Sequence, residues 1–336
     1  MNSARRLRAV FLGTPAFAIP SLRAVLDEVE VLAVVTQPDR PRGRGRQVTP
    51  PPVAQVARAL GLRVLQPARL NDPAVLDDLR ALQPDVIITV AYGKMIPPSI
   101  LALPPLGGIN VHPSLLPKYR GASPIQSAIA DGQRETGVTI MYQSETLDAG
   151  DIILQRRVPI EPDDTALTLE AKLAEVGAQT LVEALRLIAE GRAPRIPQDA
   201  SAATYVKKLT KEDGRLDWTR PAQALANLIR AMDPWPSGYT LYRGRLLKIW
   251  KGTAIESVKP AAPPGTVVEI RRGEGFVVAA GEGALLVTEV QPEGRRRMTA
   301  AEYVRGNRFQ VGEQLGDPTD GNAETRQRGS AADQDP

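Results

Sequence analysis

Cysteine is absent from this chain of 336 residues, and histidine occurs only once, at His112. The absence of cysteine excludes disulfide bonds, thiolate metal ligands and cysteine nucleophiles. A transition-metal site would have to be built from carboxylates around one imidazole, and we therefore predict that the protein binds no metal. His112 is also the one side chain of this composition whose ordinary pKa lies near neutrality.

Long apolar segments are missing as well. No stretch approaches the roughly 20 apolar residues that span a membrane. The apolar run near the N-terminus is broken by Gly13 and Pro15, too early for a signal peptide. We predict a cytoplasmic protein that does not bind membranes, and we expect it to act as a monomer.

Two common catalytic signatures are not found. The turn after the first apolar segment reads Gly13-Thr14-Pro15 rather than G-x-G-x-x-G, so the dinucleotide-binding fingerprint is absent. No serine lies in a G-x-S-x-G context. A Ser-His-Asp hydrolase that uses Ser114 or Ser123 stays open as an alternative, because both are near His112 in the sequence, but it has little support.

The N-terminal part alternates short apolar segments with helix-like segments, which predicts a doubly wound, Rossmann-like α/β fold. The segment 85–91, DVIITVA, is an uninterrupted apolar run of the kind that is covered on both faces of a sheet. Asn71 is expected to cap a helix over 71–82. We expect the other strands at 7–12, 31–36, 63–65, 109–112, 138–143 and 151–158, helices at 15–29, 53–60, 126–130 and 165–190, and a domain that comprises 1–191.

The pattern changes after a proline-containing linker at 192–208. A short helical piece is expected from Leu216, followed by five short strands with glycine-rich turns, which predicts a small OB-like β-barrel domain over 209–315. These strands are expected at 239–242, 245–250, 265–270, 275–279 and 284–290. The remainder, 316–336, is polar and acidic, and we predict a disordered tail.

The stretch from Gly107 to Pro124, GGINVHPSLLPKYRGASP, contains the single histidine. If a strand ends at His112, then Asn110 points to the same face, because side chains alternate along a strand. An amide donor beside an imidazole suits a reaction that builds negative charge on a carbonyl oxygen. The alternative is a buried, hydrogen-bonded histidine with a structural role only.

Asp148 lies in a loop between two expected strands. A loop aspartate often does no more than form a turn, but here it would also complete a set with Asn110 and His112. Such a set has no nucleophile, and it therefore implies direct transfer between substrates rather than a covalent enzyme intermediate.

Four arginines at positions 40, 42, 44 and 46 alternate with proline and glycine in QPDRPRGRGRQVTPPP. Proline and glycine exclude a packed helix or a central strand, and we expect a mobile loop. The guanidinium groups suit phosphate oxygens, although a merely solvated loop is the alternative. The net charge of +4 is compatible with a polyanionic partner without requiring one, since an arginine bias also follows from genome base composition.

The block NVHPSLLPKYRGASPIQSAI, followed by TLDAGDII, resembles the folate-dependent formyltransferases. The segments FLGTPAFA, TQPDRPRGRGR, VTIMYQ and KLTKEDGRLDW resemble the branch of that family whose acceptor is initiator methionyl-tRNA, and the similarity covers roughly residues 5–315 in order. The resemblance implies that 10-formyltetrahydrofolate donates a formyl group to the α-amine of the methionine. Rival acceptors are a sugar nucleotide or a glycinamide; a formyl-folate hydrolase and a non-catalytic RNA-binding module are further alternatives.

The same resemblance implies roles for individual residues. Asn110, His112 and Asp148 fall on the family's catalytic trio. Residues for folate binding would be Ser114, Leu115, Leu116 and Pro117, with Val90, Ala91, Tyr92, Gly93 and Met95 lining the pterin pocket. Residues for tRNA binding would be Arg44 with its neighbours Arg40, Arg42 and Arg46, and Lys207 and Lys208 at the entry to the second domain.

Overall fold

The computed structural model describes residues 6–42, 47–255, 261–307 and 309–316. The chain forms two compact units. The first comprises Met1–Ala128 and Gln133–Lys208, and the second comprises Ile129–Gly132 and Leu209–Pro336. No helix in the described part of the chain is both long enough and apolar enough to cross a membrane.

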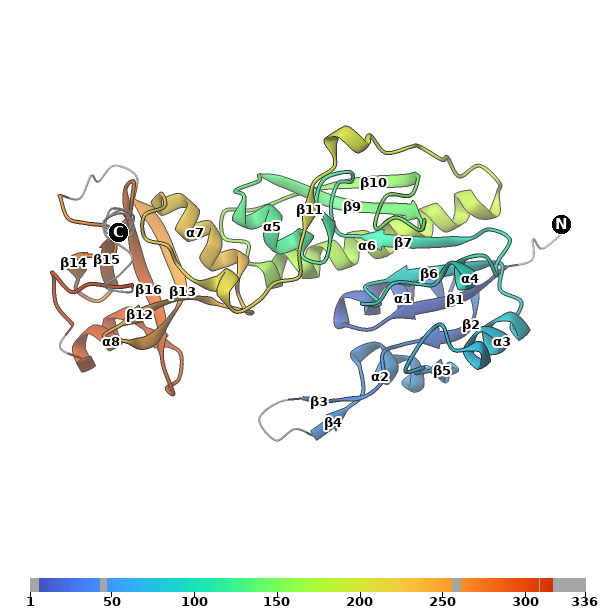
Figure 1. The fold of residues 1–336 in the computed structure, drawn as a ribbon, viewed down its shortest axis with the longest axis horizontal. Helices are drawn as coiled ribbons and strands as arrows, with labels where there is room; N and C mark the ends of the chain where they lie inside the picture. The colour runs from blue at the N-terminus through green and yellow to red at the C-terminus, as the bar shows by residue number, and fades with distance from the viewer. Residues whose placement is uncertain (1–5, 43–46, 256–260, 308, 317–336) are drawn as a thin grey trace, which may run out of the picture. The chain divides into compact units, whose positions relative to one another are not determined.

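The first unit is built on a seven-stranded sheet with the order β10-β9-β7-β6-β1-β2-β5 (Figure 1). β5, β2, β1, β6 and β7 run parallel, whereas β9 is antiparallel to both β7 and β10. Helices flank this sheet, so the predicted Rossmann-like class is confirmed. The strands are β1 (Leu7–Gly13), β2 (Val29–Val35), β5 (Val64–Leu65), β6 (Val86–Val90), β7 (Gly108–His112), β9 (Glu135–Tyr142) and β10 (Ile152–Pro159).

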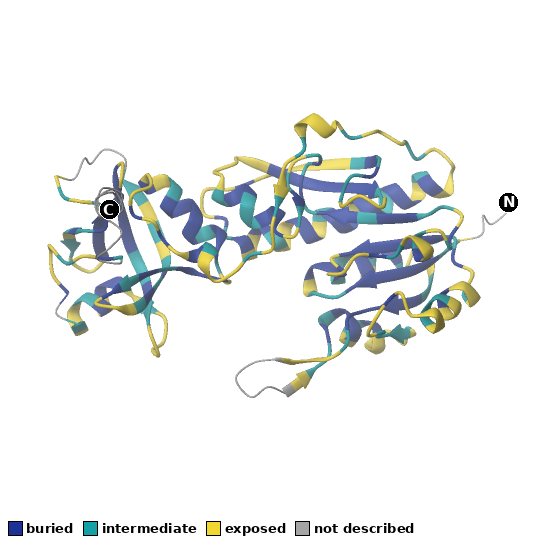
Figure 2. Cartoon of the chain, in the orientation of Figure 1, coloured by how far each residue is buried: buried dark blue, intermediate teal, exposed yellow. Residues whose placement is uncertain are grey.

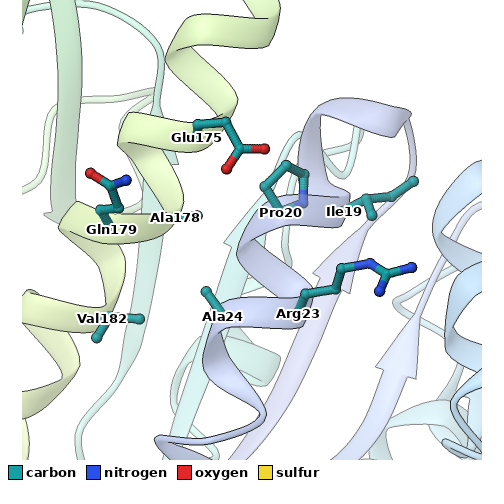
Figure 3. A pocket seen from close by; sticks show the side chains of 8 residues that line it. All are labelled: Ile19, Pro20, Arg23, Ala24, Glu175, Ala178, Gln179 and Val182. Atoms are coloured by element: carbon teal, nitrogen blue, oxygen red, sulfur yellow. The ribbon is translucent and has the colours of Figure 1, made fainter.

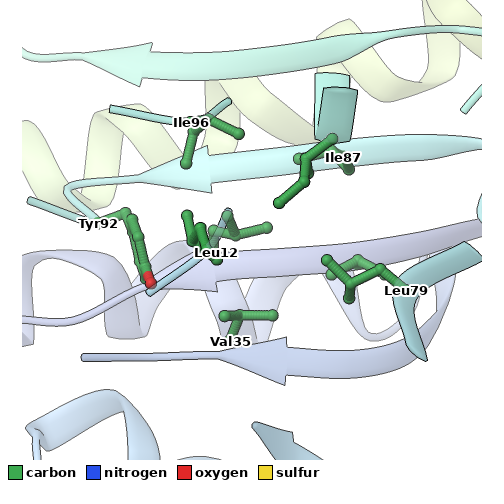
Figure 4. Close-up of a cluster of buried hydrophobic side chains, with 9 residues drawn as sticks. Leu12, Val35, Leu79, Ile87, Tyr92 and Ile96 are labelled. Carbon is green, nitrogen blue, oxygen red and sulfur yellow. The ribbon is translucent and has the colours of Figure 1, made fainter. Parts of the chain in front are cut away.

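All five residues of β6 are buried, as the apolar run predicted, because this strand lies in the middle of the sheet. Beside it, side chains from β1, β2 and β6 pack with Leu79, Tyr92 and Ile96 in one apolar cluster (Figure 4). Figure 2 shows the same concentration of buried residues along the strands of this sheet. The helices are η1 (Ala16–Ala18), α1 (Ile19–Val25), α2 (Pro52–Ala59), α3 (Pro73–Ala81), α4 (Pro98–Leu101), α5 (Pro124–Ala130) and α6 (Ala166–Ala189).

Two helix starts show how capping decides the boundary. Thr165 and Thr168 form a capping box at the start of α6, where the sequence placed a helix. For α3 the prediction of Asn71 as the cap was wrong, because the side chain of Asp72 accepts the hydrogen bond from Ala74 N at 3.0 Å. Pro73 holds the preceding residue in the extended conformation that an N-cap requires, and this shifts the cap by one position.

The arginine segment forms two short strands among its described residues. β3 (Arg40–Arg42) and β4 (Gln47–Thr49) pair as an antiparallel ribbon, with Arg40 opposite Thr49. The expectation of a loop was therefore wrong for these residues, since proline is tolerated in a two-stranded ribbon whose edges are open. Arg44 and Arg46 lie outside the described residues, as does the side chain of Arg42.

The second unit contains an antiparallel sheet with the order β12-β13-β16-β15-β14, and a short strand, β17, pairs with β16. Its main strands are β12 (Gly238–Tyr242), β13 (Arg245–Ile255), β14 (Val267–Arg271), β15 (Gly275–Ala279) and β16 (Ala284–Pro292). The additional elements are β17 (Met298–Thr299), α7 (Ala222–Ala231), α8 (Ala300–Asn307) and η3 (Glu212–Gly214). The helix expected from Leu216 begins at Ala222 instead, directly after Pro221, which is suited to a helix start.

The antiparallel domain is confirmed, but the barrel is not closed, because β12 and β14 do not pair with each other. Instead, the segment after α8 forms bridges to both edges: Leu315 pairs with Tyr242 of β12, and Gln314 pairs with Thr266 just before β14. The predicted tail after Gly316 lies outside the described residues.

The segment 192–208, expected to be a linker, carries two short elements, η2 (Ala200–Ala202) and β11 (Tyr205–Val206). β11 pairs in parallel with β8 (Arg120–Gly121), so that this segment lies against the turn that follows the histidine strand.

Candidate active site

A cavity of about 520 Å³ lies at the carboxyl ends of β6 and β7, where ligands bind in open α/β sheets. Its wall combines the loop after β1, the turn after β6, the end of β7, the loop between β9 and β10, and one residue of α6. The residues that line it include Thr89, Ala91, Tyr92, Gly93, Met95, Ile96, Leu101, Asn110, His112, Gln143, Leu147 and Asp148.

Asn110 and His112 both face this cavity from β7, as the alternation of side chains predicted. His112 is 4% exposed. Its Nε2 lies 2.9 Å from the carbonyl oxygen of Tyr119. A carbonyl can only accept a hydrogen bond, so Nε2 carries the proton and Nδ1 of the neutral ring has the free lone pair.

Asp148 completes the group. Its Oδ2 lies 3.7 Å from His112 Nδ1, which is close enough for an ion pair but too long for a hydrogen bond. The same oxygen accepts a hydrogen bond from Gly121 N at 2.9 Å. The backbone at Asp148 has a φ of +49°, a left-handed conformation that aspartate tolerates better than most side chains.

Burial lowers the pKa of His112 below its ordinary value of 6.5, and the positive charge of Arg120 acts in the same direction. The carboxylate of Asp148 and the hydrogen bond to Tyr119 oppose this shift without reversing it. The imidazole is therefore neutral at pH 7, and it can accept a proton at Nδ1.

Two residues that the sequence did not single out hold the Asp148 loop in place. The amide of Gln198 donates to the carbonyl oxygens of Asp148, at 2.9 Å, and Gly150, at 2.7 Å. The guanidinium of Arg120 donates in turn to Gln198 Oε1 at 2.7 Å. No sequence signal marks Gln198, because its partners are backbone carbonyls about fifty residues away.

The turn after β6 contributes four of its five predicted residues to the cavity wall: Ala91, Tyr92, Gly93 and Met95. Val90 does not line the cavity and belongs to the buried strand instead. A hydrogen bond to its backbone holds this turn, because Thr14 Oγ1 donates to the carbonyl oxygen of Tyr92 at 2.9 Å.

The structure places none of Ser114, Leu115, Leu116 and Pro117 in the cavity wall. The hydroxyl of Ser114 donates to the carbonyl oxygen of Lys118 at 2.7 Å, and Leu116 N donates to Thr139 Oγ1 at 3.1 Å. Leu116 is buried against Met141 and Ile152. These contacts fix the turn that brings the carbonyl of Tyr119 to His112.

Among the predicted tRNA-binding residues, the side chains of Arg40, Lys207 and Lys208 are described, and none of these three lines the cavity. Arg40 is exposed on the ribbon, and one of its guanidinium nitrogens donates to Gln37 Oε1 at 3.4 Å. Lys207 and Lys208 are exposed after β11, where the carbonyl oxygen of Lys207 accepts a hydrogen bond from Ser123 Oγ at 2.5 Å.

A second cavity, of about 680 Å³, lies between α1 and α6 (Figure 3). Arg23 from α1 and Glu175 and Gln179 from α6 line it, together with apolar residues. It contains none of the predicted site residues. Within the described ranges, no group of three or more histidine, aspartate or glutamate side chains is arranged to hold a metal ion.

Comparison with known proteins resolves the family. The formyl transferase model matches residues 8–185, and the model of the formyl transferase C-terminal domain matches residues 208–308. The methionyl-tRNA formyltransferase of Symbiobacterium thermophilum is 51% identical over 314 residues, which cover 93% of this chain and 96% of that protein. The protein of the same name from Moorella thermoacetica is 50% identical and covers 92% and 99%.

The chain belongs to the methionyl-tRNA formyltransferase family. Solved structures share the fold of this family member at low sequence identity. HypX from Aquifex aeolicus, solved with tetrahydrofolic acid, has a TM-score of 0.59 at 20% identity over 92% of this chain, which spans about half (49%) of HypX. An N-formyltransferase from Helicobacter canadensis, solved with folinic acid and dTDP-3-aminofucose, has a TM-score of 0.63 at 18% identity, covering 85% and 99%.

Proposed function

We propose that this protein transfers the formyl group of 10-formyltetrahydrofolate to the α-amine of the methionine carried by initiator tRNA. The observation that carries the proposal is the meeting of Asn110, His112 and Asp148 at one cavity. It is supported by about 50% identity, over nearly the whole chain, to proteins named methionyl-tRNA formyltransferase.

His112 is assigned the role of proton acceptor. Its Nε2–H is engaged by Tyr119, so Nδ1 keeps its lone pair. An amine that attacks a formyl carbon must lose a proton, and a neutral imidazole takes that proton at pH 7. Asp148, 3.7 Å from Nδ1, then stabilises the imidazolium until the proton passes to the nitrogen that leaves the formyl group.

Asn110 is assigned to the negative charge of the intermediate. Its side chain lines the cavity and has no hydrogen-bond partner among the residues that the structure describes. Addition of the amine to the formyl carbon places negative charge on the formyl oxygen, which an amide N–H stabilises. A bond forms from the α-amine to the formyl carbon and the bond from that carbon to folate N10 breaks, so no covalent enzyme intermediate is needed.

The cavity wall suits a folate. A flat heterocycle with polar edges needs apolar surface and a few hydrogen-bonding groups. Ala91, Ile96, Leu101 and Leu147 provide the apolar surface, and the cavity also presents the amide of Gln143. We assign the folate-facing contacts to the turn at Ala91–Met95, whereas Ser114–Pro117 act by shaping the turn beneath His112.

The tRNA-binding residues are proposed on charge and exposure. Arg40, Arg42, Arg44, Arg46, Lys207 and Lys208 are basic, and those with described side chains (Arg40, Lys207 and Lys208) are exposed. If these Lys and Arg side chains contact phosphates, the affinity for tRNA should fall steeply as the salt concentration rises.

We also propose a cytoplasmic monomer. Light scattering during size-exclusion chromatography tests the oligomeric state, and a dimer mass would contradict it.

The decisive experiment mixes the purified protein with 10-formyltetrahydrofolate and either methionyl initiator tRNA or methionyl elongator tRNA. We expect formylmethionine on the initiator tRNA only, and loss of at least roughly 100-fold in rate for His112→Ala, the usual scale for a general acid–base residue. Circular dichroism checks that the variant is folded.

Formate release without transfer to either tRNA would instead support the hydrolase alternative. Transfer to a sugar nucleotide or a glycinamide but not to tRNA would support one of the rival acceptors. Binding of tRNA without binding of folate would support the RNA-binding module.

A further inference from the structure

The cavity contains a polar pair that the reaction above does not use. Thr89 Oγ1 donates a hydrogen bond to Gln143 Oε1 at 3.0 Å. Both residues line the cavity, and Thr89 is only 5% exposed. A buried hydroxyl beside a ligand cavity is costly unless it is bonded, and here Gln143 satisfies it.

The amide of Gln143 reaches Thr89 across an intervening strand. Gln143 follows β9, Thr89 belongs to β6, and β7 lies between these strands in the sheet. The crossing point is Gly108 of β7, whose carbonyl accepts from Gln143 N at 2.8 Å. A Cβ built on Gly108 would lie 2.8 Å from Gln143 Oε1 and 2.7 Å from Leu101 Cδ2. The missing side chain therefore makes room for the amide.

This arrangement fixes which end of the amide is available. Since Oε1 accepts from Thr89, the NH₂ group of Gln143 is the end left for other contacts. Within the part of the chain that the structure describes, Gln143 Nε2 has no hydrogen-bond partner, and the side chain is half-buried. The cavity wall thus presents a donor amide whose orientation is set by a neighbour.

The position of the amide favours the formyl donor over the acceptor. The amide lies over Gly108, and its partner Thr89 pairs with Asn110, so the amide is on the side of Asn110 that faces away from His112. The amide lies close to the Leu101 side chain, which lines the same cavity as the turn at Ala91–Met95. A group on that side of Asn110 can contact the part of a bound folate that extends away from His112.

We propose that Gln143 is a specificity-determining residue for the formyl donor, with its Nε2–H₂ donating to a carbonyl oxygen or ring nitrogen of the bound folate. Thr89 is the positioning residue that sets the amide orientation, and Gly108 provides the space. This inference rests on the proposed function, because it takes the cavity to be the folate site.

The test measures the Kd of tetrahydrofolate by isothermal titration calorimetry, using the intact protein and its variants. Gln143→Met keeps the length of the side chain but removes the donor, and we expect Kd to rise roughly tenfold, as for one lost hydrogen bond to a buried acceptor. Thr89→Val should give a similar rise because it frees the amide to turn over, whereas Thr89→Ser keeps the hydroxyl and should stay near wild type.

Coupling and controls separate a positioning role from a structural one. The double variant Thr89→Val with Gln143→Met should be no weaker than Gln143→Met alone, since both changes remove the same interaction. Gly108→Ala should also weaken binding, by displacing the amide. Gln179→Met, at the cavity between α1 and α6, is the matched control and should leave Kd unchanged.

The outcomes are distinguishable. An unchanged Kd for Gln143→Met, in a protein whose wild type binds tetrahydrofolate, overturns this inference and leaves the proposed function intact. A raised KM for methionyl-tRNA with an unchanged folate Kd moves Gln143 to the acceptor side and also overturns it. Absence of folate binding by the wild type overturns both proposals.

Discussion

His112 donates from Nε2 to the carbonyl oxygen of Tyr119 at 2.9 Å, and Tyr119 presents that carbonyl from a left-handed backbone conformation with a φ of +61°. The amide of Tyr119 donates in turn to Thr204 Oγ1 at 2.7 Å. The tautomer of the imidazole is thus set by a backbone carbonyl. The residue that carries this carbonyl is held by a hydrogen bond to Thr204, which lies more than eighty positions later in the chain. A side-chain substitution at Tyr119 cannot remove that acceptor.

The first prediction concerns the pH dependence of activity. Because the pKa of His112 is lowered, we expect protonation of its imidazole to reduce kcat for formyl transfer only below pH 6.5. The α-amine of the substrate must also be neutral to attack, so its own titration adds an acid limb that does not depend on His112. The measurement is a rate profile from pH 5 to 8 at constant ionic strength. An acid limb with an apparent pKa above 6.5 that is lost in His112→Gln would contradict the neutral-base assignment.

The lowered pKa of His112 also predicts how folding stability changes with pH. Below pH 6.5 the unfolded chain binds a proton at His112 more readily than the folded protein does, since the folded-state pKa is lowered. Stability should therefore decrease as the pH falls from 6.5 toward that lowered pKa. Urea unfolding at pH 7.0 and 5.5 tests this. The loss should be smaller in His112→Gln, whose side chain does not titrate, and equal losses would refute the linkage.

Gln198→Ala should affect catalysis through the Asp148 loop. The change removes the donors to the carbonyls of Asp148 and Gly150, and each lost bond to a buried carbonyl costs about 1–3 kcal/mol. We expect kcat to fall roughly tenfold or more, with little change in the Kd of tetrahydrofolate. The control is Gln179→Ala, because Gln179 lines the cavity between α1 and α6 and not the candidate active site. A parallel rise in folate Kd would show that the loop acts in binding instead.

Tyr92→Phe should be tolerated or even stabilising. Among the described residues, the hydroxyl of Tyr92 is a buried group without a hydrogen-bond partner, and it sits in the apolar cluster of Figure 4. Removing an unsatisfied polar group relieves its desolvation cost, so the free energy of unfolding should stay equal or rise by about 1 kcal/mol. A loss of more than about 1 kcal/mol in chemical denaturation would indicate that the hydroxyl has a favourable contact.

The raised pKa of Tyr92 also predicts how the stability of the folded protein changes at alkaline pH. Burial raises its pKa to about 12, so the unfolded chain loses the phenolic proton near pH 10 while the folded protein keeps it. The folded state should therefore lose stability as the pH rises from about 10 to about 12. Tyr92→Phe should show a shallower decline than the wild type, and the pKa of Tyr303, also raised to about 12, accounts for part of what remains.

Gly150→Ala should disrupt the loop that carries Asp148. A Cβ at this position would lie 1.7 Å from the carbonyl oxygen of Tyr142, which is backbone and cannot move aside cheaply. We expect a loss of stability of several kcal/mol or an insoluble protein. Gly306→Ala is the matched control, because nothing lies within 4 Å of its Cβ position in α8, and alanine should stabilise that helix by about 0.5–1 kcal/mol. Similar stabilities for the two variants would contradict the packing argument.

The sequence by itself determined the fold class and half of the candidate site. Strands such as β6 are continuous apolar runs, and only a sheet covered on both faces buries them, so the Rossmann-like arrangement followed from local pattern. The shared face of Asn110 and His112 followed from the period of two along a strand. These properties depend on neighbours in the chain.

The tertiary structure decided the contacts between distant segments. The approach of Asp148 to His112, the fastening of that loop by Gln198, the exclusion of Ser114–Pro117 from the cavity wall and the crossing of Gln143 to Thr89 all depend on strand order and register. None has a periodic signature, because a hydrogen bond between residues fifty positions apart requires only that the fold bring one donor and one acceptor together. Sequence pattern therefore indicated which strand carries the chemistry, and packing decided which side chains surround it.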